Sequence, residues 1–498
     1  MHAIALAVVS AVVIQGPGPL EGARPQTTKL TEHKHEFQDD FCSYPSLKKR
    51  KNVSLRSVQI ISEQEPNDTL DAATVVPLTH ENPDLDVSAS NYYDEDDYFA
   101  LQLQKGDILG VACRGSAVYG GLDPQIMLMN AIGSIYITND DGLSLYPVTS
   151  PMPVSAHSTD SMLTFVVPAD GLYHILVEPF PQQGYVPSQG TYTLQFRLRR
   201  NVFEYAPPGI KQIIYVDFDG ATIPAQDLFG GATTPVNAVL SPMSAFLGSW
   251  GLSSAHEDAV INAVIVEMTK NFNRLVSANP GFDYEIRNSR DHPDTFGSDP
   301  LVTRVVIGGT RAQLGINTIG IAESIDPGNF DTSETALLLL DDLSSTDPTN
   351  PFSLNNVLIS GTSTKIQLIG TALGNMAAHE VGHTLGNWHT DPNNGIRCIM
   401  DAGGVSTLQG LYMNYFETGY DGIFGNADDN ESDFTLDLYF DAERVGMFPS
   451  IADTRTRTSY AMSGEVRTDE CLSDLNGDGL TDGLDLGLLL SNWGLCPK

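Results

Sequence analysis

The segment HEVGHTLGNWH, from His379 to His389, restricts the local fold more than any other part of this sequence. Residues four apart lie on one face of an α-helix, so a helix here points His379 and His383 in the same direction. Gly386 tolerates the left-handed conformation in which helices end, and the chain can then return so that His389 joins the other two side chains. Three imidazoles at one point predict a catalytic type of zinc site with an open fourth position, since structural sites use four protein ligands. Glu380 lies beside these ligands, where a carboxylate can accept a proton from water.

The alternative for this segment is a helix whose histidines serve only the core or the surface. A His-Glu-x-x-His match arises by chance in roughly one of 100 chains of this length and histidine content. Requiring Gly386 and His389 as well lowers the chance to on the order of a few in 100,000. These frequencies favour the metal site.

The full pattern H-E-x-x-H-x-x-G-x-x-H resembles the signature of the metzincin metallopeptidases. The segment RCIMDAGG, which contains Met400, is similar to the Met-turn of that family, in which a methionine lies beneath the zinc-binding imidazoles. The resemblance covers residues 204–452 and implies an α+β domain with a twisted mixed sheet and an active-site helix. It also implies that the three histidines bind Zn²⁺, and that the domain hydrolyses peptide bonds with water that zinc and Glu380, the catalytic base, activate.

Two positions leave the metzincin subfamily open. Ala402 stands where some metzincins have a tyrosine ligand, so no tyrosine is predicted to bind the metal. Thr390, which follows the third histidine, does not identify a subfamily. In related folds an edge strand above the cleft pairs with the extended substrate, and Thr318–Ser324 is the candidate for that strand here.

The charge of the chain excludes one class of partner. Its 498 residues include 62 acidic and 27 basic ones, which gives a formal net charge of -35. The length predicts several domains. The negative charge repels nucleic-acid backbones, so no nucleic-acid partner is predicted. Carboxylates suit Ca²⁺, which prefers oxygen ligands, although a solvated acidic surface accounts for most of them.

Residues 1–22 are predicted to be a signal peptide, because Ile4–Ile14 is an apolar run too short to span a bilayer. We therefore expect a secreted or periplasmic protein without a transmembrane segment. Residues 23–58 are predicted to be a linker or a pro-segment, and the basic cluster Lys48–Lys51 is either part of a solvated linker or a processing site. Cys42 is either an incidental or pairing cysteine, or a latency plug whose thiolate binds the zinc, as in several metzincins.

Residues 59–203 have the pattern of an all-β domain, in which short alternating runs such as DYFALQL and YHILVEP are separated by Gly, Pro and Asp turns. The segments EQEPNDTLDAA and DEDDYFALQLQKGD resemble the bacterial pre-peptidase C-terminal (PPC) domain. The resemblance implies a non-catalytic, jelly-roll-like β-sandwich of secreted peptidases, which usually follows the catalytic domain but precedes it here. Four residues of this domain are either calcium ligands or turn caps: Glu65, Asn67, Asp68 and Asp96.

Residues 204–452 change to a mixed pattern of helices and strands. Buried strands are predicted at KQIIYVDFDG, DYEIRN, TRVVIGG, IGIAES and ALLLLDDL. A long amphipathic helix is predicted over 253–276, and a second helix over Gln367–Leu385 carries the histidine motif. The loop Asp421–Asp433 collects carboxylates and glycines, and is either a structural Ca²⁺ site or a plain acidic loop.

Residues 453–468 are predicted to be a linker to a small calcium-binding tail, 469–498. The sequence DLNGDGLTDGLD places oxygen donors at positions 1, 3, 5, 7, 9 and 12 of a calcium loop. The predicted Ca²⁺ ligands are Asp474, Asn476, Asp478, the Leu480 carbonyl, Asp482 and Asp485. The tail resembles a dockerin repeat, present once where dockerins carry two, so binding of a protein partner is an alternative to a purely stabilising role. Cys471 and Cys496 bracket the tail and are the predicted disulfide.

Together these features predict a secreted, calcium-stabilised, zinc-dependent metalloendopeptidase that acts on protein or peptide substrates. The alternative is a non-enzymatic secreted adhesion or matrix-anchoring protein that binds calcium and has a degenerate or occluded zinc site. The presence of Glu380 argues against it, because inactive relatives commonly lose this glutamate. A zinc hydrolase of a non-peptide substrate is a third reading, which has no positive support in the sequence.

Overall fold

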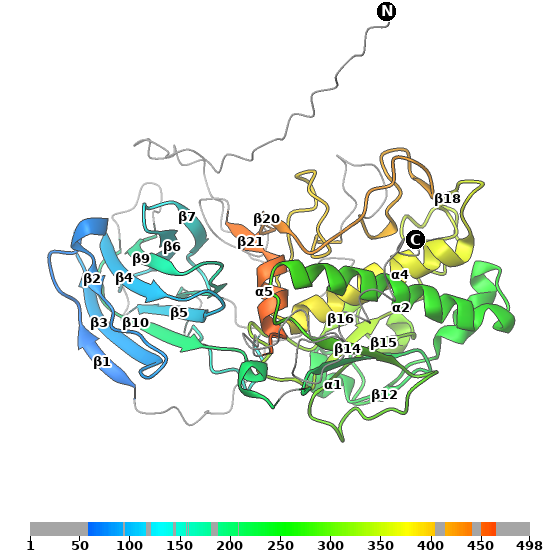
Figure 1. Ribbon diagram of the computed structural model, residues 1–498, viewed down its shortest axis with the longest axis horizontal. Coiled ribbons are helices and arrows are strands. Elements are labelled where there is room, and N and C mark those ends of the chain that lie inside the picture. Colours follow the sequence, from blue (N-terminus) through cyan, green and yellow to red (C-terminus); the bar gives the residue numbers. More distant parts are fainter. Residues whose placement is uncertain are drawn as a thin grey trace, which may run out of the picture.

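The computed structural model describes residues 58–464, with gaps at 93–94, 116–120, 143–145, 156, 158, 181–187, 208, 404–413 and 441–449. The predicted signal peptide, Cys42, the Lys48–Lys51 cluster, the calcium loop at 474–485 and the Cys471–Cys496 disulfide lie outside these residues. The described part is a β-rich multidomain protein, in which a β-sandwich stands beside a part that holds the long helices (Figure 1). Among its helices, none has the length and apolar character needed to cross a bilayer.

The sandwich consists of two five-stranded sheets. Its strands are β1 (Gln59–Ser62), β2 (Thr74–Val75), β3 (Asp84–Asn91), β4 (Asp97–Leu103), β5 (Ile108–Gly115), β6 (Pro124–Asn130), β7 (Ile135–Asn139), β8 (Ser161–Val166), β9 (Gly171–Pro179) and β10 (Gly190–Arg199). One sheet has the order β1-β3-β10-β5-β8 and the other β2-β4-β9-β6-β7. β1 pairs in parallel with β3, and β2 with β4, while the remaining pairs are antiparallel.

The alternation of side chains in these strands builds the sandwich core. In β4, Asp97, Phe99, Leu101 and Leu103 are buried, and the residues between them are more exposed, which is the period of two expected for a strand with one face inside. The inward side chains of both sheets form one hydrophobic cluster. β5 is buried on both faces, and Ile108 on its outer face belongs to a second cluster. The sandwich therefore has a second apolar surface, which packs against the rest of the chain.

The helical part is built around a mixed five-stranded sheet with the order β14-β11-β15-β17-β16. Its strands are β11 (Gln212–Asp217), β14 (Tyr284–Asn288), β15 (Val302–Ile307), β16 (Gly320–Ala322) and β17 (Thr335–Leu338). The first four strands are parallel, and β16 runs antiparallel to β17 at the edge. β16 lies within the segment Thr318–Ser324 that the sequence predicted as an edge strand.

Two long helices cover one face of this sheet. Helix α4 (Lys365–Thr384) begins two residues before the predicted Gln367, because Thr364 and Gln367 form a capping box. The long helix predicted over 253–276 is divided into a 3-10 turn η4 (Ser254–His256), α2 (Glu257–Asn273) and a 3-10 turn η5 (Arg274–Ser277). The two helices approach closely, since a methyl group on Gly370 would lie only 2.3 Å from the Cβ atom of Ala263.

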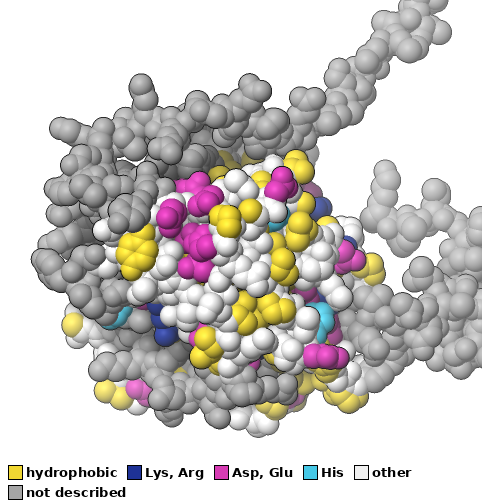
Figure 2. Space-filling model, turned by 90° about the vertical axis from the view of Figure 1, so that its left-hand side faces the viewer, with side chains coloured by type: hydrophobic (Ala, Val, Ile, Leu, Met, Phe, Trp, Pro, Cys, Tyr) yellow, Lys and Arg dark blue, Asp and Glu magenta, His cyan; other side chains and the backbone are white. Residues whose placement is uncertain are grey.

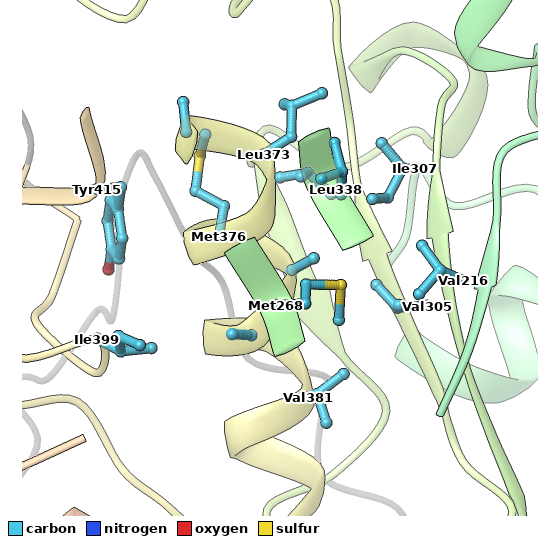
Figure 3. Packing of buried hydrophobic residues seen from close by; sticks show 14 of the residues in the cluster. Val216, Met268, Val305, Ile307, Leu338, Leu373, Met376, Val381, Ile399 and Tyr415 are labelled. Carbon is cyan, nitrogen blue, oxygen red and sulfur yellow. The ribbon is translucent and has the colours of Figure 1, made fainter. Parts of the chain in front are cut away.

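The packing of α4 buries it on several sides. Leu373, Met376 and Val381 of α4 lie near Met268 of α2 and Leu338 of β17, in a core that continues to Val216, Val305 and Ile307 of the sheet (Figure 3). Ile399 and Tyr415 close the opposite side of the helix (Figure 3). A helix enclosed in this way holds its side chains in fixed positions, which matters for the histidines that it carries.

Shorter elements complete the described fold. They are the paired strands β12 (Thr222–Ile223) and β13 (Ala238–Val239), β18 (Leu358–Ile359) and β19 (Ile423–Phe424), β20 (Leu436–Leu438) and β21 (Ile451–Asp453), the helices α1 (Ala225–Phe229), α3 (Arg311–Leu314) and α5 (Thr454–Ala461), and the 3-10 turns η1 (Leu70–Ala72), η2 (Val202–Tyr205), η3 (Met243–Trp250) and η6 (Asn414–Phe416).

Helix α5 falls in the stretch 453–468 that the sequence predicted to be a linker. It is buried and lies between the sandwich and the helical part (Figure 1). Its sequence, TRTRTSYA, has no apolar stripe, and the sequence therefore gave no sign of packing. Polar side chains enter the interior here because they form hydrogen bonds: Asp453 accepts from Thr456 at the helix start, and Arg457 donates to carbonyl oxygens.

A buried polar network joins α2, α4 and the segment that follows η6. Asn271 donates to Asn375 (2.8 Å), and Asn375 donates to a carboxylate oxygen of Glu417 (3.2 Å). The Lys270 ammonium lies 3.7 Å from the other oxygen of Glu417. Burial, and then the negative charge of Glu267, raise the pKa of Glu417 to about 7.

We predict that Glu417→Gln makes stability less dependent on pH. Between pH 4.5 and 7 the folded protein holds a proton on Glu417 that the unfolded chain has released, so the free energy of unfolding falls as pH rises through this window. The slope is at most about 1.4 kcal/mol per pH unit for one proton. Urea unfolding at pH 5, 6 and 7.5 should show a smaller fall for the variant than for wild type. The exposed Glu81→Gln serves as control and should keep the wild-type slope; an equal slope for Glu417→Gln contradicts the prediction.

Candidate metal centre

Helix α4 and the turn that follows it bring three histidines to one point. His379 and His383 stand one helical turn apart, and His389 reaches them from beyond the helix end. The three ring nitrogens lie within 4.8 Å of one another, and all three side chains are buried. The ring centroids are 4.7 Å apart for His379 and His383, 5.2 Å for His379 and His389, and 4.8 Å for His383 and His389. The structure thus brings together the three residues predicted as zinc ligands.

Hydrogen bonds to carbonyl oxygens decide which nitrogen of each helix histidine carries the proton. His379 Nδ1 lies 2.6 Å from the Ile399 carbonyl, and His383 Nδ1 lies 2.8 Å from the Asn387 carbonyl. A carbonyl only accepts, so both Nδ1 atoms carry the hydrogen. Both Nε2 atoms then present lone pairs, yet they are 3.1 Å apart. Two lone pairs at this distance repel unless a cation or a proton lies between them.

The electrostatics of the site exclude a proton in this role over the physiological range. Burial, and then the neighbouring His389, lower the pKa of His379 to about 3. Burial, followed by His379 and His389, lowers the pKa of His383 well below its usual value. The imidazoles are therefore neutral, which is the form in which histidine binds metals. Three buried imidazoles, of which His379 and His383 are neutral with fixed tautomers, fit a zinc ion.

The turn after α4 depends on Gly386. This residue has φ +92°, and a methyl group on it would lie 2.4 Å from the Pro327 Cα atom. Asn387 ties the turn to the helix, since its side chain donates to the Gly382 carbonyl (3.0 Å) while its own carbonyl accepts from His383. The glycine was expected from the sequence, but its contact with the loop between β16 and β17 was not.

Met400 lies beneath the helix, between the first two histidines. A methyl group on Gly382 would lie 2.5 Å from the Met400 sulfur, so the thioether occupies space that a larger residue at this position would fill. Backbone bonds between Thr390 and both Met400 and Ala402 hold the segment against the strand after His389. The Thr390 hydroxyl also donates to Asp401 (2.9 Å). Thr390 therefore joins the third histidine to the turn that carries Met400.

Cys398 forms no disulfide and lies buried beside this turn. Its sulfur is 3.5 Å from the Thr454 hydroxyl. Burial, and then the charge of Asp401, raise the pKa of the thiol to about 12. Cys113 in β5 is likewise a free, buried thiol, and burial raises its pKa well above the usual value.

Tyr415 supports the first histidine, and the sequence did not reveal it. Its hydroxyl lies 3.0 Å from His379 Nδ1 and donates to the Asp401 carbonyl. It faces the nitrogen that points away from the other histidines, so it orients the ring and is not a metal ligand. No motif marks this tyrosine, which comes from the segment at η6 rather than from the position two residues after Met400.

Glu380 points from α4 towards the edge strand β16. A methyl group on Gly320 would lie 1.8 Å from Glu380 Oε1, so the carboxylate occupies the space of a side chain that Gly320 lacks. Glu380 is fully buried. The predicted base is thus placed between the metal-binding histidines on its own helix and the edge of the sheet.

The sandwich holds a second group of candidate ligands. Carboxylate oxygens of Glu63, Glu65 and Asp97 lie within 4.8 Å of one another. Asn67 donates its backbone N–H to Glu65 (3.1 Å), and the Asn91 amide donates to Asp97 (3.3 Å), so both asparagines border the group. One side-chain oxygen each of Glu63, Asn67, Asn91 and Asp97 is buried and accepts no hydrogen bond within the described residues.

The charges of this group repel one another. Burial is the largest cause that raises the pKa of Glu63 to about 7, with further contributions from Asp97 and Glu65. Burial likewise raises the pKa of Asp97 to about 6. Several Asp and Glu side chains gather on this end of the molecule, with few basic ones among them (Figure 2). Converging carboxylate and amide oxygens of this kind fit a Ca²⁺ ion, which prefers oxygen ligands.

The ligand set differs from the residues that the sequence indicated. Glu65 belongs to the group and Asn67 borders it, whereas Asp68 and Asp96 are not among its members. Asp97 is buried in place of Asp96, because the pleat of β4 turns Asp97 to the same side as Phe99.

The predicted calcium loop Asp421–Asp433 contains no group of three converging ligand residues among those described. Asp428 accepts from the backbone N–H groups of Tyr420 and Asp421, and Asp429 accepts from that of Gly425. These carboxylates hold the loop through its own backbone.

Comparisons with known proteins give the chain no family. No family model matches the sequence, and no curated protein is significantly similar to it. Solved structures resemble parts of it distantly. The pre-peptidase C-terminal domain of a collagenase from Bacillus anthracis is 12% identical, over 29% of this chain and 100% of that one, with a TM-score of 0.16. PliG, a periplasmic inhibitor of g-type lysozyme from Aeromonas hydrophila, is 12% identical over 29% and 100%, with a TM-score of 0.19. The surface-associated copper-binding protein CorA of Methylomicrobium album BG8 is 12% identical over 28% and 100%, with a TM-score of 0.17.

We predict that Gly386→Ala costs more stability than Gly395→Ala. Both glycines have positive φ, so each alanine carries the left-handed penalty of about 1–2 kcal/mol. Only at Gly386 does the new methyl group meet a neighbour, and displacing the Pro327 backbone adds about 1–3 kcal/mol; around Gly395 there is open space. Urea unfolding of the two variants measures the difference. Equal losses would show that the turn and the Pro327 segment do not press on each other.

Proposed function

We propose that this chain is a zinc-dependent metalloendopeptidase. The observation that carries the proposal is the pair of Nε2 lone pairs on His379 and His383, held 3.1 Å apart by carbonyl oxygens, with His389 beside them. The helix spacing of the motif, Met400 beneath the helix and the antiparallel edge strand β16 support a metzincin-like arrangement.

The residues of the candidate site have separate roles in the proposed hydrolysis. His379, His383 and His389 would hold the zinc ion, which would supply Lewis acidity to polarise a carbonyl and to lower the pKa of water towards neutrality. Glu380, one residue from the first ligand, accepts the proton of the attacking water and returns it to the leaving amine. Ile399, Asn387 and Tyr415 fix the imidazole planes, so the ligands need no reorganisation.

The edge strand supplies a place for an extended substrate. β16 is the terminal strand of its sheet and lies against α4 at Glu380. A peptide that pairs with it as an additional strand brings its backbone carbonyls past the carboxylate. Pairing through main-chain atoms explains how such a site acts on protein substrates of varied sequence.

We predict that Glu380→Ala retains zinc but loses proteolysis. The three ligands are unchanged, so metal analysis should still find one zinc per chain. Loss of the proton acceptor should lower the rate of casein cleavage by a factor of about 100 to 10,000. Glu81→Ala, a change in an exposed carboxylate of the sandwich, is the control and should keep zinc and most of the activity.

Two results separate this proposal from a non-enzymatic adhesion or anchoring role. Cleavage by Glu380→Ala at the wild-type rate contradicts the mechanism. The non-enzymatic role is favoured if the wild-type protein binds zinc but cleaves neither casein nor a mixed peptide library, so that phenanthroline has no activity to inhibit.

We further propose that the sandwich binds a structural Ca²⁺ ion through Glu63, Glu65, Asn67, Asn91 and Asp97, and that the chain is exported. The buried oxygens without hydrogen-bond donors support the calcium site. Export rests on the N-terminal apolar run and agrees with the calcium sites, since free calcium is abundant outside cells.

We predict that Ca²⁺ stabilises the protein and that Asp97→Asn removes most of this effect. Calcium at 100 times its dissociation constant adds about 2.7 kcal/mol to the stability of the state that binds it. The melting temperature should rise with Ca²⁺ and fall with a chelator in wild type. Asp96→Asn, a change in the exposed neighbour, is the matched control and should respond like wild type. Calorimetric titration should show one Ca²⁺ fewer for Asp97→Asn, and an unchanged stoichiometry would refute the site.

A further inference from the structure

The turn between the second and third histidines is held by residues from outside the helical core. The Gly386 carbonyl accepts from Arg457 Nη1 of α5 (2.8 Å). The side-chain amide of Asn387 donates to the Thr458 hydroxyl of the same helix (2.8 Å). The backbone carbonyl of Asn387 accepts from His383 and so orients its ring. Helix α5 therefore holds two successive residues of the turn by hydrogen bonds.

Trp388 is the neighbour of the third histidine in the sequence, and it belongs to the core of the sandwich. It is 3% exposed and lies in the hydrophobic cluster formed by both sandwich sheets, whereas Val381 and Leu385 of the preceding helix lie in the core of the helical part. The residues of the helical part that enter the sandwich cluster are Ile325, Trp388, Tyr439 and Ala452. His389 thus follows directly after a side chain that is anchored in the other domain.

Arg457 joins the turn and the sandwich through one side chain. Its Nη2 donates to the Thr164 carbonyl of β8 (3.0 Å) and to the Tyr439 hydroxyl (2.6 Å), while its Nη1 holds Gly386. The guanidinium is buried, and its hydrogen bonds offset the free-energy cost of removing its positive charge from water. A shift of the sandwich would break these bonds or move the turn with it.

The sandwich also reaches α5 from a second direction. Ile108 of β5 packs in a cluster with Tyr460 of α5 and with Phe330 of the loop between β16 and β17. Asn201, just after the last sandwich strand, donates to the Gly328 carbonyl (2.7 Å) and to the Ala461 carbonyl. The same loop presses on Gly386 through Pro327. The contacts of the turn with α5 and with the 327–330 loop therefore both lead to the sandwich.

We propose that the β-sandwich is a positioning element of the metal centre, and that Trp388 and Arg457 are the positioning residues that couple its docking to the direction of His389. The inference rests on the proposed function only in that the three histidines bind zinc; it requires no peptidase activity. The sandwich is then a part of the metal site rather than an independent accessory domain.

The test measures zinc affinity in full-length variants by competition with a chromophoric chelator. Trp388→Ala and Arg457→Gln should weaken zinc binding by about 10- to 100-fold, the range for residues that orient metal ligands. Ile108→Ala, which touches neither the turn nor a ligand, should weaken it at least about threefold through α5. Leu101→Ala truncates an equally buried side chain elsewhere in the sandwich core, and should lower the melting temperature while leaving zinc affinity within about twofold of wild type.

Cobalt substitution gives a signature that a loss of stability alone does not produce. The visible spectrum of the Co²⁺ protein should change in Trp388→Ala, where the third imidazole is misplaced, and remain as in wild type in Leu101→Ala. Trp388→Phe keeps an aromatic anchor and should recover most of the affinity and the spectrum. Wild-type zinc affinity in Trp388→Ala overturns the inference, and if Trp388→Ala does not fold, wild-type zinc affinity in Arg457→Gln overturns it. Absence of zinc binding in wild type overturns the metal centre itself, and zinc binding without proteolysis overturns only the peptidase proposal.

Discussion

The contact between the Nε2 atoms of His379 and His383 is the one on which the arrangement around the helix depends. Each imidazole donates its only proton to a carbonyl behind it, so two lone pairs face each other across 3.1 Å. Without a cation this contact opposes folding, and burial prevents the rings from relieving it by taking up a proton. The fold therefore has to hold the rings in place with free energy from packing elsewhere, and binding of the proposed zinc ion would return part of that free energy.

The source of that energy is the enclosure of α4. A helix that carries polar ligands is packed against the sheet and α2 on one side, and against Ile399 and Tyr415 on the other (Figure 3). Gly370 lets α2 approach, and Gly382 lets Met400 approach, because neither position has a side chain to keep the neighbour away. Gly320 likewise has no side chain, and the space this leaves is filled by the carboxylate of Glu380. Small residues thus decide how near the functional groups come to one another.

The sequence predicts the parts of this site that local geometry determines. Helical spacing was sufficient for His379 and His383, and the glycine at a positive φ was expected from the way helices end. The strands of the mixed sheet follow apolar runs. The choice between Asp96 and Asp97 was also present in the sequence, since extending the alternation of Phe99 and Leu101 back by one step points to Asp97.

What the sequence did not reveal depends on contacts between distant segments. Tyr415 has no spacing relation to the histidine that it orients, and α5 has no apolar stripe that announces its burial. Trp388 is apolar and adjacent to a ligand, but nothing local tells into which of two cores it inserts. The place of Tyr415 depends on how distant segments of the helical part pack, and those of α5 and Trp388 depend on how the two domains meet. That information is spread over the whole chain.

The two described cysteines have a consequence for how the protein survives oxidising surroundings. Cys113 and Cys398 are both enclosed thiols whose pKa values are raised by burial, so the thiolate that attacks disulfides or reacts with peroxide is nearly absent. An odd number of cysteines usually threatens an exported chain with wrong pairings during folding and ageing. Here, once the cores have closed, these two sulfurs are chemically silent. Disulfide exchange therefore does not reach the segment that carries Met400, because the Cys398 thiol beside it is enclosed.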